Sequence, residues 1–266
     1  MTDDSEIEGL RMRIPQYSYG GRDAFLGIME HELSLPLPKN DVLLFTISDH
    51  QFQRDFLHSD ETTFSQSWKE YSSSSHSLLV KMLSGPHEQA HLTFIQIITE
   101  TANSLGISDE LLFQGGRTQH LNTTYKQADS SIVPVAFAAR GHPTVAIEVA
   151  LSESNAQLHR DAENWLRGSQ GQVQSVITIL IKRNTRDLVI RRWIMQKNAL
   201  FVAQEVLVNV QLLRTRSQDS FTVTGAPFII PFHHLFLRPP SSNTNEADFQ
   251  FNVANLIRLA QRTWSI

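Results

Sequence analysis

The most constraining feature of this 266-residue chain is a pair of almost wholly apolar segments with one amphipathic segment between them. Residues 144–151 (TVAIEVAL) and residues 173–182 (VQSVITILIK) are rich in β-branched side chains. Strands that are covered on both faces have this composition, whereas half-exposed strands alternate apolar and polar residues. Residues 155–166 place four apolar side chains on one helical face, namely Leu158, Ala162, Trp165 and Leu166. The order strand, helix, strand predicts a parallel crossover in an α/β sheet.

Further elements on both sides extend this predicted sheet. Upstream, Pro86 begins a predicted helix that Gly106 ends. Five side chains repeat at helical spacing along it: Leu92, Ile95, Ile98, Thr99 and Ala102. Strands are expected at residues 111–116 and 123–134, and residues 187–195 alternate as an outer hairpin strand would. The order helix, three strands, helix, two strands predicts a mixed central sheet flanked by helices.

We expect three regions along the chain. Residues 1–83 form an N-terminal accessory region, in which residues 41–47 (DVLLFTI) are the best strand candidate. The serine run at residues 71–77 is interpreted as a connection or a helix start, because serine caps and turns bond to nearby backbone. Residues 84–197 form the core. Residues 198–266 form a C-terminal extension with strands and a terminal amphipathic helix that packs on the core.

Two adjacent histidines, His233 and His234, lie in a segment that prolines interrupt and that we expect to be extended. Side chains of neighbouring strand residues point to opposite faces of a sheet. The pair is therefore not expected to share one metal ion.

Composition excludes several kinds of site and partner. The chain contains no cysteine, so disulfides, thiolate zinc sites and a cysteine nucleophile are excluded. The first 13 residues are acidic and polar, and no apolar stretch reaches the ~18 residues of a membrane span. We therefore expect a soluble intracellular protein, cytoplasmic or nuclear. Because the net charge is −4, any contact with DNA or RNA must come from a local basic patch.

Two acids lie in neighbouring predicted strands. Glu148 interrupts the apolar run of residues 144–151, and Asp129 lies in the strand before it. A carboxylate in a buried strand is costly unless it is paired, hydrogen-bonded or bound to a metal. Glu148 is therefore either a site residue or the partner of an arginine, with Arg160 and Arg140 as the candidates.

A third acid, Glu88, lies in the first turn of the helix that begins at Pro86. The helix dipole favours an anion at this position, so electrostatic capping explains Glu88 without any functional role. The alternative is that Glu88 contributes to a metal site.

The motifs KQADSS (126–131), PTVAIEVALSES (143–154) and LHRDAENWL (158–166), taken with the strand–turn–helix context, resemble the PD-(D/E)XK nuclease superfamily. This superfamily has the restriction-endonuclease-like fold, and the sequence is similar in particular to a set of fungal proteins that carry the domain. The resemblance covers about residues 84–197.

The resemblance implies a function and assigns roles to the three acids. Asp129 corresponds to the aspartate of the PD half-motif and Glu148 to the glutamate of the E-x-K half-motif, and Glu88 would be the helix acid. Together they would bind one or two Mg²⁺ ions, or Mn²⁺, which prefer hard oxygen ligands. The implied activity is hydrolysis of DNA or RNA phosphodiester bonds.

The sequence departs from the superfamily pattern at two positions. Ala128 replaces the proline, and Ala150 stands where the pattern has its lysine. A cation at that lysine position stabilises charge that develops on the attacked phosphate.

Two residues are candidates to replace this lysine. Lys126 would need a β-bulge to reach the site, and Arg160 on the following helix would serve as a phosphate-stabilising cation because arginine stays protonated. Ser152 and Glu153 are nearby polar residues for which a capping role is an equal explanation.

Two functional interpretations follow. The first is a Mg²⁺-dependent nuclease, which the retained acids favour. The second is a catalytically inactive relative that acts as a nucleic-acid or protein interaction module, which the missing lysine favours. A metabolic enzyme is not supported, because the sequence has no P-loop, no dinucleotide-binding glycine pattern and no G-x-S-x-G motif.

Nucleic-acid binding requires a basic surface. Six basic residues lie close together in the sequence around the predicted hairpin: Lys182, Arg183, Arg186, Arg191, Arg192 and Lys197. Such a cluster is either a phosphate-contacting patch or the solvated surface of an outer strand and its turn.

Overall fold

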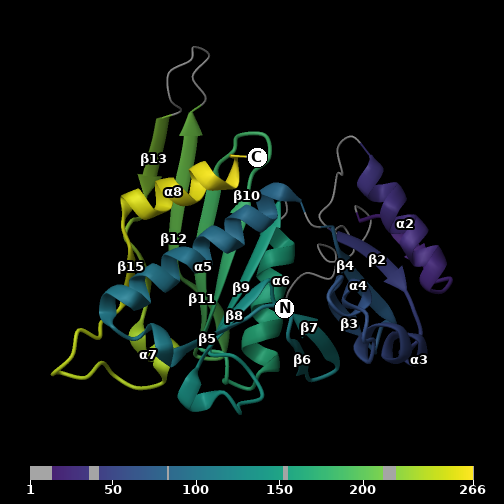
Figure 1. Cartoon of the computed structure of the whole chain (residues 1–266), viewed down its shortest axis with the longest axis horizontal. Coiled ribbons are helices and arrows are strands. Elements are labelled where there is room, and N and C mark those ends of the chain that lie inside the picture. The colour runs from purple at the N-terminus through teal and green to yellow at the C-terminus, as the bar shows by residue number, and fades with distance from the viewer. Residues whose placement is uncertain (1–13, 36–41, 83, 152–154, 212–219, 266) are drawn as a thin grey trace. The chain divides into compact units, whose positions relative to one another are not determined.

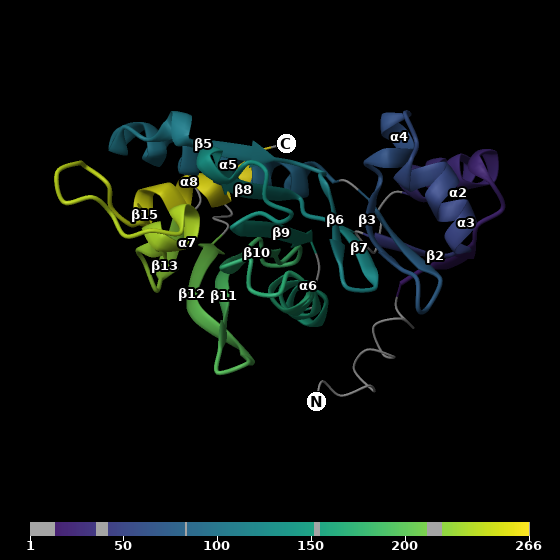
Figure 2. The same ribbon diagram turned by 90° about the horizontal axis from the view of Figure 1, so that it is seen from below.

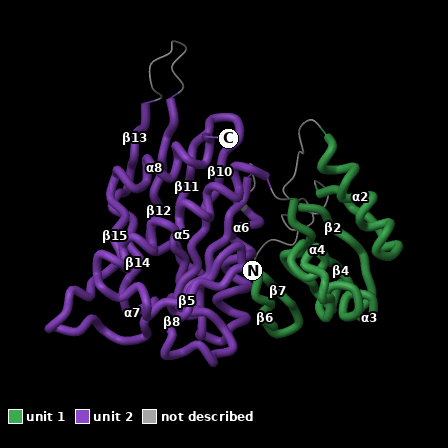
Figure 3. The backbone as a smooth tube through the Cα atoms, in the orientation of Figure 1, with its two compact units in different colours: residues 1–83, 116–127 green, residues 84–115, 128–266 purple. Residues whose placement is uncertain are grey.

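The computed structural model describes residues 14–35, 42–82, 84–151, 155–211 and 220–265. The chain forms two compact units (Figure 3). Unit 1 contains residues 1–83 and 116–127, and unit 2 contains residues 84–115 and 128–266. Each unit has its own sheet and its own hydrophobic core.

Unit 1 is built on a six-stranded sheet with the strand order β1-β2-β4-β3-β7-β6 (Figure 1). Its elements are β1 (Gln16–Ser18), α2 (Arg22–Ser34), β2 (Val42–Thr46), α3 (Asp49–Phe52), the π-helix η1 (Gln53–Leu57), α4 (Thr62–Ser65), β3 (Trp68–Ser72), β4 (Ser77–Lys81), β6 (Thr118–Leu121) and β7 (Thr124–Gln127). Strands β1 and β2 are parallel, and the other neighbours are antiparallel. An aromatic core, in which Phe25, Phe52, Phe56 and Trp68 are buried, holds the helices on this sheet.

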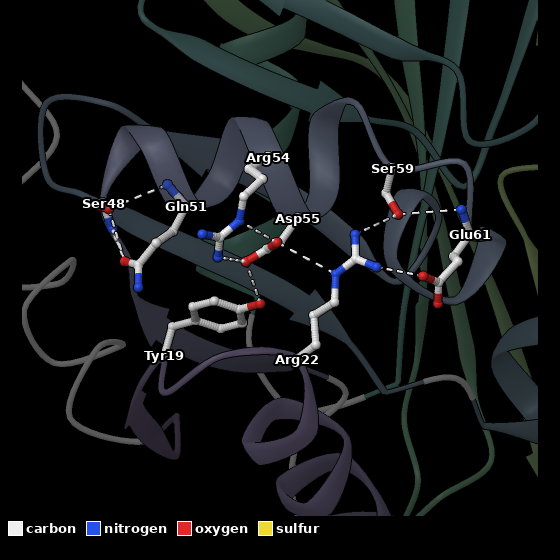
Figure 4. Close-up of polar contacts among 8 residues, drawn as sticks. All are labelled: Tyr19, Arg22, Ser48, Gln51, Arg54, Asp55, Ser59 and Glu61. Carbon is white, nitrogen blue, oxygen red and sulfur yellow. Dashed lines mark hydrogen bonds and ion pairs between the residues drawn. The ribbon is translucent and has the colours of Figure 1, made fainter.

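A buried carboxylate ties the polar side chains of unit 1 together (Figure 4). Asp55 of η1 accepts hydrogen bonds from Tyr19 Oη (2.9 Å) and from Arg54 Nη2 (2.6 Å). Arg22 Nε lies 3.4 Å from Asp55 Oδ1, and the same guanidinium also bonds to Glu61. The Arg54 hydrogen bond is the largest cause that lowers the pKa of Asp55. The carboxylate thus joins the start of α2 to η1, and its charge is compensated inside the unit.

Unit 1 differs from the sequence expectation in two respects. Helix α2 was not predicted, and residues 116–127, which were expected within the core, belong to unit 1. The strand expected at residues 41–47 is confirmed as β2. Of the two interpretations of the serine run, the connection is confirmed, because residues 73–76 are the turn of the β3–β4 hairpin.

Unit 2 is built on a seven-stranded mixed sheet with the order β13-β12-β11-β10-β9-β8-β5. Its elements are α5 (Gly85–Leu105), η2 (Ser108–Glu110), β5 (Leu111–Gln114), β8 (Ser130–Pro134), η3 (Val135–Phe137), β9 (Val145–Leu151), α6 (Asn155–Gly168), β10 (Ser175–Ile181), β11 (Leu188–Gln196), β12 (Ala199–Gln211), β13 (Ser220–Thr224), β14 (Phe228–Ile230), α7 (Phe232–Phe236), β15 (Phe249–Phe251) and α8 (Val253–Thr263). Strands β9 and β10 are parallel, and every other neighbouring pair in the seven-stranded sheet is antiparallel.

Helices cover both faces of the unit 2 sheet (Figure 2). Helices α5 and α8 pack on one face, where Val145, Ile147 and Val149 of β9 belong to the main core. Helix α6 packs on the opposite face, where Leu158 contacts Ala150. Because successive strand side chains point to opposite faces, every residue of β9 is buried by one layer or the other. The predicted mixed α/β sheet flanked by helices is confirmed.

The elements nearest the predicted crossover are also confirmed. Strands β9 and β10 are buried at every position, and α6 connects them as a parallel crossover. Helix α5 begins after the Ser84 cap and ends at Gly106, which has φ 74°. Helix α8 buries Leu256 and Leu259 in the core of unit 2, as expected of a docked terminal helix.

Several expectations for unit 2 are wrong in detail. Leu92 was placed on the buried face of α5 but is 53% exposed, and the inward face runs instead through Phe94 and Ile98. The predicted strand at 123–134 is two strands, since β7 lies in unit 1 and β8 in unit 2. Strand β11 is not an outer strand, because β10 and β12 flank it. His233 and His234 lie in the short helix α7, not in an extended segment.

The inward face of α5 can be tested by substitution. Ile98→Ala should lower the free energy of unfolding by about 2–5 kcal/mol, because it removes fully buried methylene and methyl groups and leaves a cavity. Leu92→Ala, one and a half turns earlier on the exposed face, should change it by no more than about 0.5 kcal/mol. Urea unfolding followed by circular dichroism measures both. Equal losses for the two variants would contradict this orientation of the helix.

Candidate functional site

The two predicted acids lie close together in register at the start of β8. Ser130, the first residue of β8, pairs with Ile147 of β9 in antiparallel register. Asp129 immediately precedes β8, and Glu148 follows Ile147 in the middle of β9. Both acids therefore lie one register position beyond this pair, Glu148 within its predicted strand and Asp129 just outside β8.

Glu148 lies on the α6 face of the sheet. Its side chain shares that face with Ala150, since strand residues two apart point the same way. Trp165 of α6 donates its indole Nε1–H to Glu148 Oε1 at 2.5 Å. Glu148 is fully buried, so this hydrogen bond stabilises a carboxylate that would otherwise be costly. The two arginines considered as its partners bond elsewhere: Arg160 Nη2 donates to Gln157 Oε1 (2.7 Å), and Arg140 Nη2 donates to the Gln172 carbonyl (3.0 Å).

Asp129 has partners on β9 and on α5. Its Oδ2 accepts a hydrogen bond from the backbone N–H of Val149 at 2.8 Å. The side chain thus bonds to the backbone of β9 at the point where β8 begins. His87 Nε2 of α5 lies 3.3 Å from the same oxygen, and the Asp129 side chain is only 2% exposed. The described partners of Asp129 and Glu148 therefore come from helices on opposite faces of the sheet.

His87 connects two of the three predicted acids. Its Nε2 faces Asp129, and its Nδ1 lies 3.3 Å from Glu88 Oε1. A neutral imidazole offers one donor, and an ionised carboxylate only accepts. A doubly protonated ring satisfies both carboxylates at once. The ring therefore holds Glu88 and Asp129 in one cluster.

His91, one turn along α5, completes this cluster. Its Nε2 lies 3.2 Å from Glu88 Oε2, and its Nδ1 lies 3.3 Å from Ser130 Oγ. The hydrogen bond from His87 is the largest cause that lowers the pKa of Glu88 to about 2, and the bond from His91 is the next. We call these five residues the His87 cluster, namely His87, Glu88, His91, Asp129 and Ser130.

The position of the absent lysine is apolar. Ala150 is buried in a small cluster with Leu158, Leu180 and Val189. Lys126, one candidate replacement, lies in β7 of unit 1, where its Nζ is 3.1 Å from Glu70 Oε2. Arg160, the other candidate, is held on α6 by Gln157, and Gln157 in turn donates to Asp161 Oδ1 at 3.1 Å. Ser152 and Glu153 lie outside the described residues.

The donor chemistry of the acids suits a hard divalent cation. Mg²⁺ is commonly held by one or two carboxylates together with substrate phosphates and water. Asp129 and Glu148 supply two such carboxylates at adjoining register positions. Among the residues with described positions, no group of three or more histidine, aspartate or glutamate side chains is arranged to hold a metal ion.

Four residues of this region were missed from the sequence. His87, His91 and Ser130 belong to the His87 cluster, and Trp165 bonds to Glu148. The spacing of His87 and His91, four residues apart on a predicted helix and next to Glu88, was a usable indication, because such residues share a helical face. Trp165 was assigned to the apolar face, but a buried indole N–H also needs an acceptor.

The six basic residues do not form one cluster. Lys182, Arg183 and Arg186 lie at the β10–β11 turn, and Lys197 lies at the β11–β12 turn. The nine-residue strand β11 separates these turns by about 30 Å. Arg191 and Arg192 lie within the strand between the two turns, and Arg191 Nε bonds to Glu205 Oε2 at 2.5 Å. Any basic patch is therefore limited to one end of the strand or the other.

Comparisons with known proteins give little further information. No family model and no curated protein matches the sequence. Among solved structures, the chain is similar to a protein from Anabaena variabilis described as a "putative nuclease belonging to DUF820", at 13% sequence identity and a TM-score of 0.42. The match covers 80% of this chain and 99% of that chain. A TM-score of this size does not establish a common fold.

None of the described helices combines the length and the apolar composition that crossing a bilayer requires.

The depressed pKa of Glu88 predicts acid sensitivity. Its folded value of about 2 lies below the usual 4.5, so its ion pairs stabilise the fold above pH 4.5. That contribution is lost as the pH falls from about 4.5 to about 2. The Glu88 side chain is 38% exposed, so water screens the pairs and the loss is modest. Titration by ¹³C NMR should find the low pKa in the wild type and a higher one in His87→Gln. An unchanged value in that variant would contradict the assigned cause.

The bond between Trp165 and Glu148 can be measured with a double-mutant cycle. Trp165→Phe should lower the free energy of unfolding, because it removes a donor from a fully buried carboxylate. The same substitution in a Glu148→Ala background should cost less, and the difference should be about 1–3 kcal/mol. Chemical unfolding of the four proteins gives this coupling energy. A coupling near zero would show that the bond contributes nothing.

Proposed function

We propose that unit 2 is a nuclease-fold domain that hydrolyses phosphodiester bonds of nucleic acid with the help of a divalent cation. The observation that carries the proposal is that Asp129, which immediately precedes β8, and Glu148 of β9 both lie one register position beyond the Ser130–Ile147 pair. These strands belong to a core with the order α5, β5, β8, β9, α6, β10, in which only β9 and β10 are parallel. This order of elements is the one expected from the motifs that resemble the PD-(D/E)XK superfamily.

Asp129 and Glu148 are the residues that would hold the cation, and Glu88 is the further acid nearest to them through His87. A bound Mg²⁺ or Mn²⁺ supplies Lewis-acid polarisation of the phosphate and a nucleophilic water. The chain itself orients the two carboxylates. The Val149 N–H fixes Asp129, and the Trp165 indole N–H fixes Glu148. His87 Nε2 lies 3.3 Å from Asp129 Oδ2, where an N–H would donate to this carboxylate.

Charge on the attacked phosphate needs a cation that Ala150 does not provide. Arg160 is the candidate that unit 2 itself contains. Its guanidinium bonds to Gln157 through Nη2, whereas its buried Nε has no hydrogen-bond partner among the described residues. The side chain is thus anchored at one nitrogen and retains donor capacity for a phosphate oxygen.

Contacts to backbone phosphates away from the cleaved bond would come from one small group of basic residues. The β10–β11 turn carries Lys182, Arg183 and Arg186, and it is the one turn of the sheet in which three of the predicted basic residues lie close together in sequence. We assign backbone phosphate binding to this turn, because clustered lysine and arginine side chains displace counterions from nucleic acid.

A second candidate function rests on the packing around Ala150. Ala150 lies in an apolar cluster, and Glu148 beside it is fully buried and bonded to Trp165. Both features are those of a structural core. On this view the acids stabilise the fold, and the domain binds a nucleic acid or a protein without cleaving it.

Cleavage assays distinguish the two functions. Wild-type protein should cleave single- or double-stranded DNA or RNA in the presence of Mg²⁺ or Mn²⁺, and chelation should abolish the activity. Asp129→Asn and Glu148→Gln should each lower the rate by about 10²-fold or more, because they remove a charged ligand while keeping the side-chain shape. Gel electrophoresis of labelled substrates measures the rates.

Glu100→Gln is the matched control, since Glu100 bonds to Arg258 of α8 on the surface of the same unit. It should cleave like the wild type. Activity that persists in both Asp129→Asn and Glu148→Gln would refute the proposed site. Nucleic-acid binding without cleavage by a folded wild-type protein would establish the second function.

A further inference from the structure

Arg192 of β11 is a partly buried cation whose Nε has no hydrogen-bond partner among the described residues. This nitrogen is shielded from solvent. Arg191, the preceding residue, points to the other face of the sheet and forms an ion pair with Glu205. A buried guanidinium that lacks acceptors is costly, and native proteins rarely retain one without a role.

A second unsatisfied group lies near this guanidinium. His234 of α7 has a buried Nδ1 that has no hydrogen-bond partner in the part of the chain with described positions. Burial is the largest cause that lowers the pKa of His234 to about 4, and the charges of His233 and Arg192 contribute further. His234 is therefore neutral at pH 7. Gln204, the partner of Arg192 on β12, accepts a hydrogen bond from the backbone N–H of Ile229 at 2.8 Å. This bond places the segment that leads into α7 on the same face of the sheet as Arg192.

The charge of Asp248 raises the pKa of both Arg192 and His234, but its carboxylate is not hydrogen-bonded to either side chain. Its charge opposes the burial effect that lowers the pKa of Arg192. Its Oδ1 accepts the backbone N–H of Phe232 at 2.8 Å, which fixes the carboxylate at the start of α7. The guanidinium and the imidazole thus retain free hydrogen-bonding capacity.

We propose that Arg192 and His234 form a binding site for a phosphate-type oxyanion. The guanidinium fork matches two oxygens of a tetrahedral oxyanion, and the imidazole donates to a third. A water molecule would satisfy one donor but would not compensate the charge of the guanidinium. The exposed His233 ring, whose centroid is 4.5 Å from that of His234, marks the solvent side of the site.

Charge balance favours this occupant. Asp248 offsets the charge of Arg192 only in part, and an oxyanion with two negative charges adds more negative charge than the guanidinium supplies. Protonation of His234 supplies the missing positive charge, because a neighbouring anion favours the imidazolium form. Anion binding should therefore be coupled to the uptake of a proton by His234.

The site is separate from the acids assigned to hydrolysis. Arg192 pairs with Ile177, Ile177 with Ile147, and Ile147 with Ser130. Three strand spacings of ~4.8 Å place Arg192 about 14 Å from Ser130 across the sheet. The inference consequently does not depend on hydrolysis at Asp129 and Glu148. The phosphate group could belong to a small phosphorylated ligand or to the backbone of a nucleic acid.

Thermal unfolding with and without sulfate tests the site in the full-length protein. Sulfate is the probe because it stays fully ionised between pH 5 and 8. It should raise the Tm of the wild type and of Arg191→Gln, which is the matched control for loss of one positive charge on the same strand. Arg192→Gln should lose the sulfate effect. Without sulfate, Arg192→Gln should melt about 2–4 °C above the wild type, because an unpaired buried charge has been removed.

NMR of the His234 ring provides a readout that does not depend on stability. Sulfate should raise the pKa of His234 from about 4 in the wild type. It should leave that pKa unchanged in Arg192→Gln. The affinity for sulfate should fall about tenfold or more in that variant. Repeating the titration with inorganic phosphate and with a short single-stranded oligodeoxynucleotide identifies the source of the oxyanion. A response to phosphate alone indicates a small ligand, and a stronger response to the oligonucleotide indicates a nucleic-acid backbone.

Two results would overturn the proposal. One is a sulfate-induced shift in Tm and in the His234 signals that is the same in Arg192→Gln as in the wild type. The other is the absence of any sulfate or phosphate response in a folded wild-type protein. Neither result would bear on cleavage, because that assay depends on Asp129 and Glu148.

Discussion

The parallel pairing of β9 with β10 is the constraint on which unit 2 depends. The two strands pair over their full length, and every residue of both is buried. A parallel pair needs a crossover, which α6 supplies, and it needs cover on its second face, which α5 and α8 supply. A polar side chain on these strands must consequently find its partner inside the protein. Glu148 of β9 bonds to Trp165 of α6, and Asp129, just before the neighbouring strand β8, lies beside His87 of α5.

Local sequence patterns predicted the elements that this pairing requires. The apolar runs of β9 and β10, the Pro86 and Gly106 boundaries predicted for α5 and the apolar face of α8 all depend on short-range chemistry that is visible in the sequence. The break inside residues 123–134 could not be predicted in this way. Strands β7 and β8 have continuous strand-like sequence, yet they belong to different sheets, and only tertiary packing separates them. For the same reason the sequence could not place Lys126 in the unit where it pairs with Glu70.

The sequence predicted the acids of the candidate site but not the side chains that contact them. A carboxylate at position 148 in an apolar strand required a donor, and arginine was the natural expectation. The donor is an indole N–H, because Trp165 presents an apolar ring to the core and a polar edge to Glu148. Helical periodicity predicts that the apolar ring of Trp165 is buried, but it does not predict which group accepts the hydrogen bond from the indole N–H. The apolar periodicity of α5 does not point to its histidines, because His87 and His91 lie on the polar part of the helix, where His87 joins Glu88 to Asp129.

Two neighbouring arginines of β11, Arg191 and Arg192, lie in different electrostatic environments. Arg191 shares its face and its row with Thr178 and Glu148, and it has an ion pair with Glu205. Arg192 points to the opposite face, where Ile177 and Ile147 are its neighbours along the row. An apolar residue would suit that environment better, since burial disfavours the charged guanidinium. A sequence under selection for stability alone would not keep an unsatisfied cation there, and recognition of an anion provides a physical reason to keep it.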